Sequence, residues 1–254
     1  MTATNKTALI TGGSRGLGRN MAQHLAAQGH DIIITYNSNK ADADAVVAGI
    51  EANGGKAVAL KLDVGDIASL APFVTEVTEM LKTKFGRERI DFLINNGGMG
   101  QTIPFANATE NDVDRFYNVH YKGVYFLIQH SLAIINDGGR IINISTGTTR
   151  FVNPGYQIYA SMKSAVETLT RYLAKDLGPR QITVNVVAPG AIETDFNNAF
   201  IRSNEHVKKM ISSNTPLGRV GVPDDIGMVI AFLCSEGSRW INGQRIEVSG
   251  GVNA

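Results

Sequence analysis

A tyrosine and a lysine four residues apart carry the most informative chemistry of this sequence. Tyr159 and Lys163 lie near the start of residues 157–177, which have helical spacing, so both side chains are expected on one face of a helix. An ordinary tyrosine has a pKa of about 10, and a neighbouring ammonium group lowers that pKa because it stabilises the phenolate. Tyr159 is therefore a candidate general acid or base. Such a pair also arises by chance on amphipathic helices, so the prediction depends on other residues.

A glycine-rich turn supplies a second candidate site. Residues 11–18 read Thr-Gly-Gly-Ser-Arg-Gly-Leu-Gly and join a predicted strand to a predicted helix. Glycine permits positive φ and a close approach of a pyrophosphate to the main chain, and a helix N-terminus offers unpaired N–H groups. A tight turn without a ligand is the structural alternative, which the position after a first strand makes weaker. The predicted cofactor-binding residues of the turn are Gly12, Ser14, Arg15, Gly16, Leu17 and Gly18.

The end of the second predicted strand indicates which dinucleotide is bound. Dinucleotide-binding folds commonly place an acidic residue about 20 residues after the glycines, where it grips the adenosine ribose. This chain instead has Tyr36, Asn37 and Ser38, followed by Lys40. A carboxylate there would repel a 2′-phosphate, whereas these residues and Arg15 can donate hydrogen bonds to it. We predict NADP(H) as the cofactor; the alternative is that Arg15 and Lys40 are ordinary surface charges.

Both candidate sites fall within a regular alternation of predicted strands and helices. Strands are predicted at residues 8–11, 32–36, 57–62, 90–94, 140–144, 182–187 and 245–248. Helices are predicted at residues 17–28, 40–53, 67–84, 110–136, 157–177 and 223–235. Because the strands lack polar alternation, we predict a single α/β domain over residues 1–254, with a doubly wound, seven-stranded, Rossmann-like parallel sheet and helices on both faces. Residues 195–214 are polar and weakly periodic, which fits either a mobile substrate lid or an ordinary surface excursion.

Composition excludes several classes of protein. The chain has 254 residues, is 43% hydrophobic and carries a formal charge of +1, so we expect a compact domain without nucleic-acid or membrane partners. No apolar run approaches the roughly 18 residues that span a bilayer, and we expect a cytoplasmic protein. Cys234 cannot form an internal disulfide and is interpreted as a small buried hydrophobe. The five histidines show no metal-ligand spacing, so metal catalysis is not expected.

Several ordered motifs together resemble those of the short-chain dehydrogenase/reductase family, in its 3-oxoacyl-(acyl carrier protein) reductase-like branch. The matching stretches are Thr11–Gly18, Asp63-Val64, Asn95–Gly98, Asn118, Tyr159 with Lys163, Pro189–Thr194 and Ser249–Gly251. The resemblance implies that Tyr159 protonates a substrate carbonyl as hydride arrives, and that Lys163 lowers the pKa of Tyr159 and holds the nicotinamide ribose. It also implies that Asn118 organises a water in a proton relay. His120 lies two residues further on, so its side chain points elsewhere on a helix, and it is interpreted as structural.

The resemblance implies further contacts with the cofactor. Asp63 and Val64 would meet the adenine, and Asn95 and Gly97 would line the cofactor cleft. Turn formation at residues 95–97 and backbone capping by Asn118 are the structural alternatives. Further contacts are implied for Pro189 and Gly190, and for Ile192 and Thr194, which would orient the nicotinamide carboxamide.

Two positions depart from the family pattern. The family usually has a serine thirteen residues before its tyrosine, where this chain has Thr146. We assign the carbonyl-binding role to Thr146 and keep Ser145 as the alternative, because neighbouring strand residues face opposite ways. Reductases that act on the acidic acyl carrier protein resemble one another in a basic residue at the place of Asp137, although Arg180 is retained at a second docking position. A free small ketone or aldehyde, or a thioester on another carrier, is therefore favoured.

These observations predict an NADPH-dependent carbonyl reductase that transfers a hydride to a ketone or aldehyde, with Tyr159 as the proton donor. The same residues could oxidise an alcohol, and a non-catalytic NADP(H)-binding module is the alternative from another class. The walls of the substrate pocket are expected at Met99, Phe151 and Tyr156. Residues 115–135 are apolar around much of a helix, which predicts a homo-oligomer, and the resemblance suggests a dimer of dimers.

Overall fold

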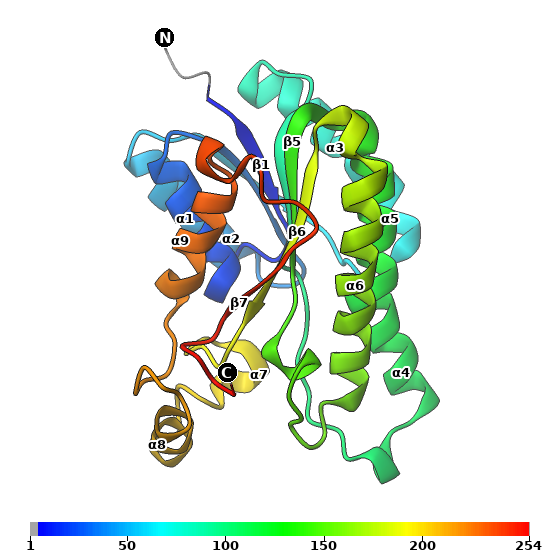
Figure 1. Cartoon of the computed structure of the whole chain (residues 1–254). Helices are drawn as coiled ribbons and strands as arrows, with labels where there is room; N and C mark the ends of the chain where they lie inside the picture. The colour runs from blue at the N-terminus through cyan, green and yellow to red at the C-terminus, as the bar shows by residue number, and fades with distance from the viewer. Residues whose placement is uncertain (1–4, 254) are drawn as a thin grey trace.

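A parallel β-sheet forms the centre of the molecule (Figure 1). The computed structural model describes residues 5–253, except for the side chains of Asn197 and Asn198. Within that range the sheet has seven strands in the order β3-β2-β1-β4-β5-β6-β7, and every neighbouring pair is parallel. The strands are β1 (Thr7–Ile10), β2 (Asp31–Tyr36), β3 (Ala57–Lys61), β4 (Ile90–Asn95), β5 (Ile135–Ile144), β6 (Thr183–Pro189) and β7 (Arg245–Val248).

Helices cover both faces of the sheet, with α1, α2 and α9 on one side and α3, α5 and α6 on the other (Figure 1). The helices are α1 (Gly16–Ala27), α2 (Lys40–Ala52), α3 (Ile67–Met80), α4 (Glu110–Tyr117), α5 (Gly123–Ser131), α6 (Gln157–Asp176), α7 (Phe196–Ala199), α8 (Glu205–Ser213) and α9 (Pro223–Leu233). Each helical layer packs on its own cluster of buried apolar side chains. The predicted doubly wound, Rossmann-like α/β fold is confirmed.

The apolar runs form strands because both faces of the sheet are buried. Ile32, Ile33 and Ile34 of β2 are all fully buried. Successive side chains of a strand point to opposite faces, so Ile33 joins the cluster under α3, α5 and α6, while its two neighbours join the cluster under α1, α2 and α9. Cys234 is buried in the latter cluster, as predicted, and burial raises the pKa of its thiol.

The helix predicted over residues 110–136 is interrupted. Thr109 and Asp112 form a capping box at the start of α4, but Asn118–Lys122 is a π-helical segment between α4 and α5. The chain then enters β5 at Ile135, earlier than the predicted strand start. Similarly, the helix predicted to reach residue 84 is α3 followed by a π-helical segment. A π segment adds a residue to one turn, and a search for a period of 3.6 residues does not detect it.

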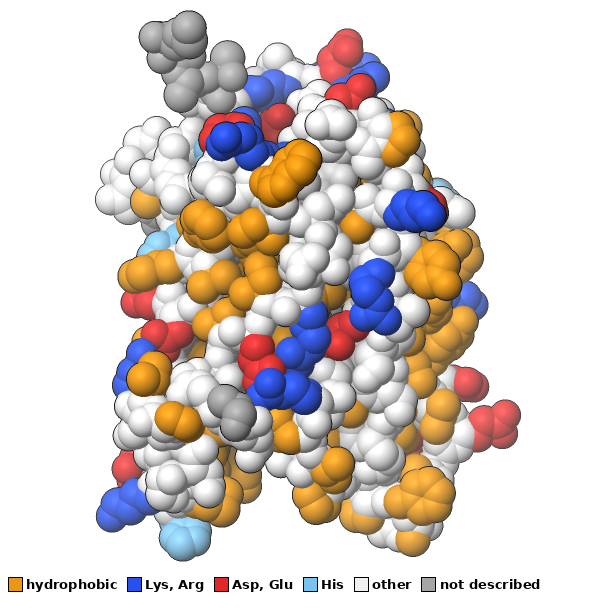
Figure 2. All heavy atoms as spheres, viewed as in Figure 1, with side chains coloured by type: hydrophobic (Ala, Val, Ile, Leu, Met, Phe, Trp, Pro, Cys, Tyr) orange, Lys and Arg blue, Asp and Glu red, His pale blue; other side chains and the backbone are white. Residues whose placement is uncertain are grey.

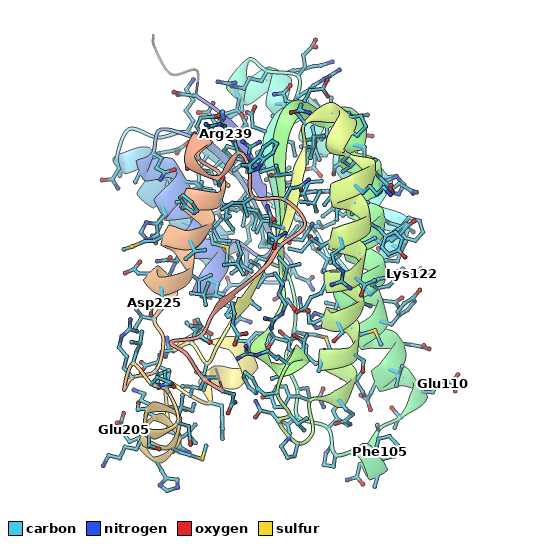
Figure 3. The ribbon with its side chains drawn as sticks, viewed as in Figure 1. Phe105, Glu110, Lys122, Glu205, Asp225 and Arg239 are labelled. Carbon is cyan, nitrogen blue, oxygen red and sulfur yellow. The ribbon has the colours of Figure 1, made fainter. Side chains whose placement is uncertain are left out.

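The polar segment at residues 195–214 is largely helical. It contains α7 and α8, and the Asn204 side chain caps α8 by accepting hydrogen bonds from two backbone N–H groups. Glu205, at the start of α8, and Phe105, before α4, lie at the same end of the molecule on opposite sides (Figure 3). These two segments therefore flank the end at which the parallel strands terminate. Within residues 5–253, no helix is both long and apolar enough to cross a membrane.

Candidate active site

The glycine turn between β1 and α1 has the geometry of a phosphate cradle. Gly12 and Gly16 have positive φ values of 65° and 54°. A Cβ atom on Gly18 would lie only 2.2 Å from the carbonyl oxygen of Gly12, so helix and turn pack at a distance that only glycine allows. Arg15 is extended and exposed just before the α1 N-terminus. The main chain of the turn and the unpaired N–H groups at the start of α1 are therefore suited to bind the pyrophosphate of a dinucleotide.

Asn96, which follows β4, holds this turn in place. Its Nδ2 donates to the carbonyl oxygens of Thr11 at 2.9 Å and Gly12 at 3.1 Å, and the Gly97 N–H donates to Thr11 Oγ1 at 2.8 Å. Asn95 instead points into the interior, where its Nδ2 donates to Asn143 Oδ1 at 2.8 Å. The prediction named Asn95 and Gly97 as lining the cleft. In the structure the Gly97 backbone and the Asn96 side chain contact the turn, and the Asn95 side chain points away from it.

The predicted adenosine end of the site is open to solvent. Asn37 and Ser38 are exposed after β2, and Tyr36 is partly buried. Lys40 Nζ forms an ion pair with Asp44 at 2.7 Å, so this ammonium is less available to bind a phosphate than the sequence suggested. In the next loop, Asp63 is exposed and accepts a hydrogen bond from the Gly65 N–H, and Val64 packs against the core.

The loop after β6 closes over the glycine turn. The Gly190 N–H donates to the Val248 carbonyl at 2.9 Å, which fixes the end of β6, whose last residue is the buried Pro189. Beyond it, the buried Thr194 approaches the turn: a Cβ atom on Gly16 would lie 3.6 Å from the Thr194 Cβ. Ile192 is buried and pairs with Gly221 as an isolated bridge. Of these predicted residues, Thr194 therefore lies beside the turn. Leu17 is partly buried against the core, and Ser14 is partly buried within the turn.

Lys163 is a buried cation that donates a hydrogen bond to a carbonyl oxygen. Its Nζ donates to the Ile144 carbonyl at 2.7 Å and lies 5.8 Å from the centre of the Tyr159 ring. The two side chains are on one face of α6, as their spacing predicts. Burial lowers the pKa of Lys163 from 10.5 to about 8, because the interior disfavours the charged ammonium.

Tyr159 is surrounded by rings and is partly buried. Its ring contacts those of Phe116, His120, Tyr156 and Phe196, at centroid distances of 6.5, 5.0, 6.2 and 6.2 Å. Burial raises the pKa of Tyr159 above its ordinary value, and a hydrogen bond from Thr146 opposes that shift. The resemblance implied that Lys163 lowers the pKa of Tyr159, whereas here desolvation of the phenol dominates and the pKa is raised.

The neighbouring hydroxyls of Ser145 and Thr146 face different surroundings. Ser145 Oγ donates to Glu167 Oε1 at 2.6 Å, in a network that also includes Arg245. Thr146 hydrogen-bonds with Tyr159. This divergence follows from the alternation of side chains at the end of β5, and it places the Thr146 hydroxyl beside the phenol.

His120, rather than Asn118, faces the tyrosine from the helix opposite. His120 is 1% exposed, and its ring meets the Tyr159 ring edge-on at 5.0 Å. Phe116 and His120 are four residues apart and share this face, whereas Asn118, two residues from each, is partly exposed on another face. His120 and Asn118 therefore lie on different faces, as expected from their spacing, and His120 is the one that meets the Tyr159 ring. In the sequence, the spacing of four residues between Phe116 and His120 was the available indication that both lie on one face of the helix.

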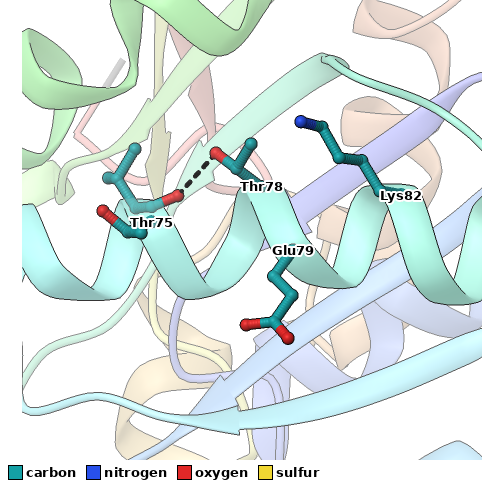
Figure 4. Close-up of a pocket in the computed structure, with 5 residues that line it drawn as sticks. Thr75, Thr78, Glu79 and Lys82 are labelled. Atoms are coloured by element: carbon teal, nitrogen blue, oxygen red, sulfur yellow. Dashed lines mark hydrogen bonds between the residues drawn. The ribbon is translucent and has the colours of Figure 1, made fainter.

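Two hollows on the surface lie beside helices α3 and α6. Thr75, Thr78, Glu79 and Lys82 line one on α3 (Figure 4), where Thr78 Oγ1 already donates to the Val74 carbonyl at 2.9 Å. The other, of about 270 Å³, lies beside the N-terminus of α6 and includes Tyr156. Phe151 lies nearby, stacked over Gly147. Across residues 5–253, no group of three histidine, cysteine or acidic side chains could hold a metal ion.

Comparisons with known proteins place the whole chain in one family. A family model described as Enoyl-(Acyl carrier protein) reductase matches residues 12–253. Hydroxynaphthalene reductase-like protein Arp2 of Metarhizium brunneum is 37% identical and covers 97% of this chain and 94% of its own. The reductase LugOII, which catalyses keto-reduction at C1 during lugdunomycin biosynthesis, has a TM-score of 0.94 at 36% identity, over 99% of each chain. A short chain dehydrogenase from Burkholderia cenocepacia J2315, in complex with NADP, has a TM-score of 0.90 at 38% identity, over 98% of each chain.

These similarities cover the glycine turn, the tyrosine–lysine pair and the loop after β6 together. The predicted family and cofactor are confirmed, whereas the 3-oxoacyl branch stays a prediction. The chain belongs to the short-chain dehydrogenase/reductase family and is an NADP-dependent oxidoreductase.

Proposed function

We propose that this protein is an NADPH-dependent carbonyl reductase, in which a ketone or aldehyde receives a hydride at carbon and a proton from Tyr159 at oxygen. The observation that carries the proposal is the meeting of Tyr159, Thr146 and Lys163 at the end of the sheet where the glycine turn lies. The keto-reduction named for LugOII supports the direction of the reaction.

The chain offers NADPH a site along this end of the sheet, and the bound cofactor supplies the hydride. The glycine turn holds the pyrophosphate, and Arg15, Asn37 and Ser38 are free to donate to the 2′-phosphate. Thr194, beside Gly16, is placed to meet the nicotinamide end. The adenine is expected against the loop that contains Asp63 and Val64.

The surroundings of Tyr159 keep its phenol protonated. Because burial raises its pKa, the phenol holds its proton at neutral pH and is available as an acid. Thr146, already bonded to the phenol, is placed to donate a hydrogen bond to the same substrate oxygen. Lys163 uses one N–H on the Ile144 carbonyl, so two others remain to bind a ribose hydroxyl and to stabilise the phenolate left after proton transfer.

The surroundings of Tyr159 favour a flat, ring-containing ketone over an acyl carrier protein substrate. Tyr156 and Phe196 flank the phenol, and Phe196 also covers Gly100, so the approach to Tyr159 is aromatic. Arg180 is not free to attract an acidic carrier: its Nε donates to Asp137 at 2.7 Å, and its other nitrogens donate to backbone carbonyls. The naphthalene-derived name of the Metarhizium brunneum relative agrees with this preference.

Substitution of the proton donor tests the function. Tyr159→Phe is expected to lower kcat about 10²- to 10⁴-fold while NADPH still raises the melting temperature. The assay follows NADPH absorbance with a bicyclic aromatic ketone, an aliphatic aldehyde and a 3-oxoacyl thioester, and the exposed Tyr172→Phe on the same helix is the control. Full activity in Tyr159→Phe refutes the role. A flat wild-type trace with every substrate, together with thermal stabilisation by NADPH, favours a non-catalytic binding module.

We also propose that copies of the chain associate through the flank formed by α4, α5 and α6. Hydrophobic side chains are exposed along this flank (Figure 2), and Tyr117 and Tyr125 are 39% and 38% exposed. An apolar flank of this kind typically packs against a symmetric copy. Light scattering is expected to show a dimer or tetramer, and a monomer at micromolar concentration would contradict the proposal.

A further inference from the structure

Thr146 lies at the point where the chain leaves the sheet. The Ser145 N–H still continues the ladder of β5 with β6, because it donates to the Val187 carbonyl at 2.8 Å. Thr146 is extended, and a 3₁₀ turn over Gly147–Thr149 follows it. The Thr148 N–H donates to Thr146 Oγ1 at 3.2 Å, so the hydroxyl accepts there and keeps its own hydrogen to donate. The direction of this hydroxyl therefore depends on how the turn is held.

The guanidinium of Arg245, on β7, fixes the backbone of this turn. Its Nη2 donates to the Thr146 carbonyl oxygen at 3.2 Å and to Thr149 Oγ1 at 3.1 Å. The Thr149 hydroxyl in turn lies 3.0 Å from the Thr146 carbonyl oxygen. One nitrogen of an arginine 99 residues further along the chain therefore contacts both Thr146, which precedes the turn, and Thr149, the last residue of the turn.

Two carboxylates fix the guanidinium itself. Arg245 Nε donates to Glu167 Oε1 at 2.9 Å, and Nη1 donates to Glu247 Oε2 at 2.9 Å. The same Glu167 oxygen lies 2.9 Å from Thr149 Oγ1, so α6 and β7 hold the turn together. The side chains of Arg245 and Glu167 are 23% and 12% exposed, which limits competition by water for these hydrogen bonds.

The division of the guanidinium among different acceptors is the informative feature. The strongest arginine pairs are bidentate, with two nitrogens on one carboxylate. Arg245 instead gives one nitrogen to each of two carboxylates and the third to the main chain of Thr146. The guanidinium is planar, so fixing two of its nitrogens also fixes the direction of the third. This arrangement suits the placement of the Thr146 carbonyl better than it suits the strength of an ion pair.

We propose that Arg245 is a positioning residue, which directs the Thr146 hydroxyl toward Tyr159 and the substrate oxygen by holding the Thr146 carbonyl. This proposal rests on the proposed function, in which Thr146 donates to the carbonyl of the substrate. A donor that is already in place needs no reorganisation during the reaction. Misplacement of such a group by about 1 Å can lower a rate about 10²-fold, so loss of the guanidinium is expected to lower kcat about tenfold or more.

A double-mutant cycle separates positioning from general support of the fold. If Arg245 acts through Thr146, its loss matters only while the Thr146 hydroxyl is present. We expect Arg245→Met to lower kcat about tenfold or more in the otherwise unchanged chain, but less than about threefold in Thr146→Ala, with the KM for NADPH unchanged. Arg171→Met, an exposed change on α6, is the control for loss of an arginine and should leave kcat unchanged.

Equal losses of kcat in the two backgrounds would show a purely structural role and overturn the proposal, as would an unchanged kcat in Arg245→Met. Arg245→Lys keeps the charge, but a single ammonium does not reproduce the planar fork that holds separate acceptors. This variant should therefore retain most of the loss in kcat, and full activity in it would also overturn the proposal. If Arg245→Met does not fold, Arg245→Lys replaces it in the cycle.

An NMR measurement separates this test from that of the proposed function. The γ-methyl resonance of Thr146, identified by its loss in Thr146→Ala, reports the placement of this side chain without turnover. In the cofactor-free protein we expect Arg245→Met to shift or broaden this resonance and Arg171→Met to leave it unchanged. An unmoved resonance in Arg245→Met would overturn the positioning role. A wild type that reduces no carbonyl would instead overturn the proposed function, and the resonance would still decide the role of Arg245.

Discussion

Replacing Lys163 by methionine should stabilise the cofactor-free protein while removing its activity. Lys163 is 4% exposed and donates a hydrogen bond to the neutral Ile144 carbonyl. Each pKa unit corresponds to about 1.4 kcal/mol, so the fall of its pKa from 10.5 to about 8 corresponds to about 3 kcal/mol for burying the charge. Methionine has a similar length and no charge, but it leaves the carbonyl without this donor, which costs about 1–2 kcal/mol. The net expected gain is about 1–2 kcal/mol.

The sign of the pH dependence follows from the two pKa values of the lysine. Below pH 8 both folded and unfolded chains carry the proton, so the full penalty of charge burial is present. Between the folded value of about 8 and the unfolded value of 10.5, the folded chain releases a proton that the unfolded chain keeps, and stability rises with pH. Lys163→Met lacks this group. Its advantage over the wild type is therefore greatest near neutrality and narrows as pH rises toward 10.

Thermal unfolding without cofactor, from pH 7 to 10, measures this difference. For a chain of this size, 1–2 kcal/mol corresponds to an increase in melting temperature of about 2–6 °C. Lys175→Met, an exposed change on the same helix, is the control and should stay within about 1 °C of the wild type. A Lys163→Met protein that melts below the wild type at pH 7, or whose difference from it is constant with pH, would refute the reasoning.

Three other predictions concern the glycine turn, the two hydroxyls and the cofactor. Gly18→Ala places a methyl 2.2 Å from a turn carbonyl, and should abolish NADPH-induced thermal stabilisation. Thr146→Ala should lower kcat about 10²-fold or more, whereas Ser145→Ala, which loses a hydrogen bond to Glu167, should lower stability by about 1–3 kcal/mol and keep kcat within about twofold. Asn37→Asp should raise the KM for NADPH about tenfold but leave that for NADH nearly unchanged, and equal effects on both would contradict the assigned 2′-phosphate site.

The sequence was informative where a local pattern has one structural solution. The isoleucines of β2 predicted a strand buried on both faces, and residues 11–18 predicted a turn whose Gly18 allows no side chain. The capping box of Thr109 and Asp112 was readable from spacing alone. These features depend on neighbours in the chain, so periodicity and residue type identify them.

The features that sequence did not predict depend on contacts between distant segments. The role of Asn96 requires β4 to lie beside β1, which brings its amide to the Thr11 carbonyl 85 residues away. The contact between His120 and Tyr159 requires the π-helical segment, which changes the helical phase that spacing assumes. The raised pKa of Tyr159 reflects burial by rings from other elements, and a count of four residues to Lys163 contains no information about that burial.

Two cations at this end of the molecule show how a structural charge differs from one with a proposed catalytic role. Arg245 of β7 is paired with Glu167 and Glu247, each at 2.9 Å, and charged side chains gather beside this strand on the surface (Figure 2). Lys163 is more deeply buried, yet no carboxylate pairs with it among the described residues. A carboxylate would stabilise the fold, but it would also neutralise the ammonium and compete with a phenolate and a ribose hydroxyl for its N–H groups. The unpaired lysine is therefore destabilising for the same reason that it suits its proposed role, and its pairing state separates the proposed catalytic residues from the structural network beside them.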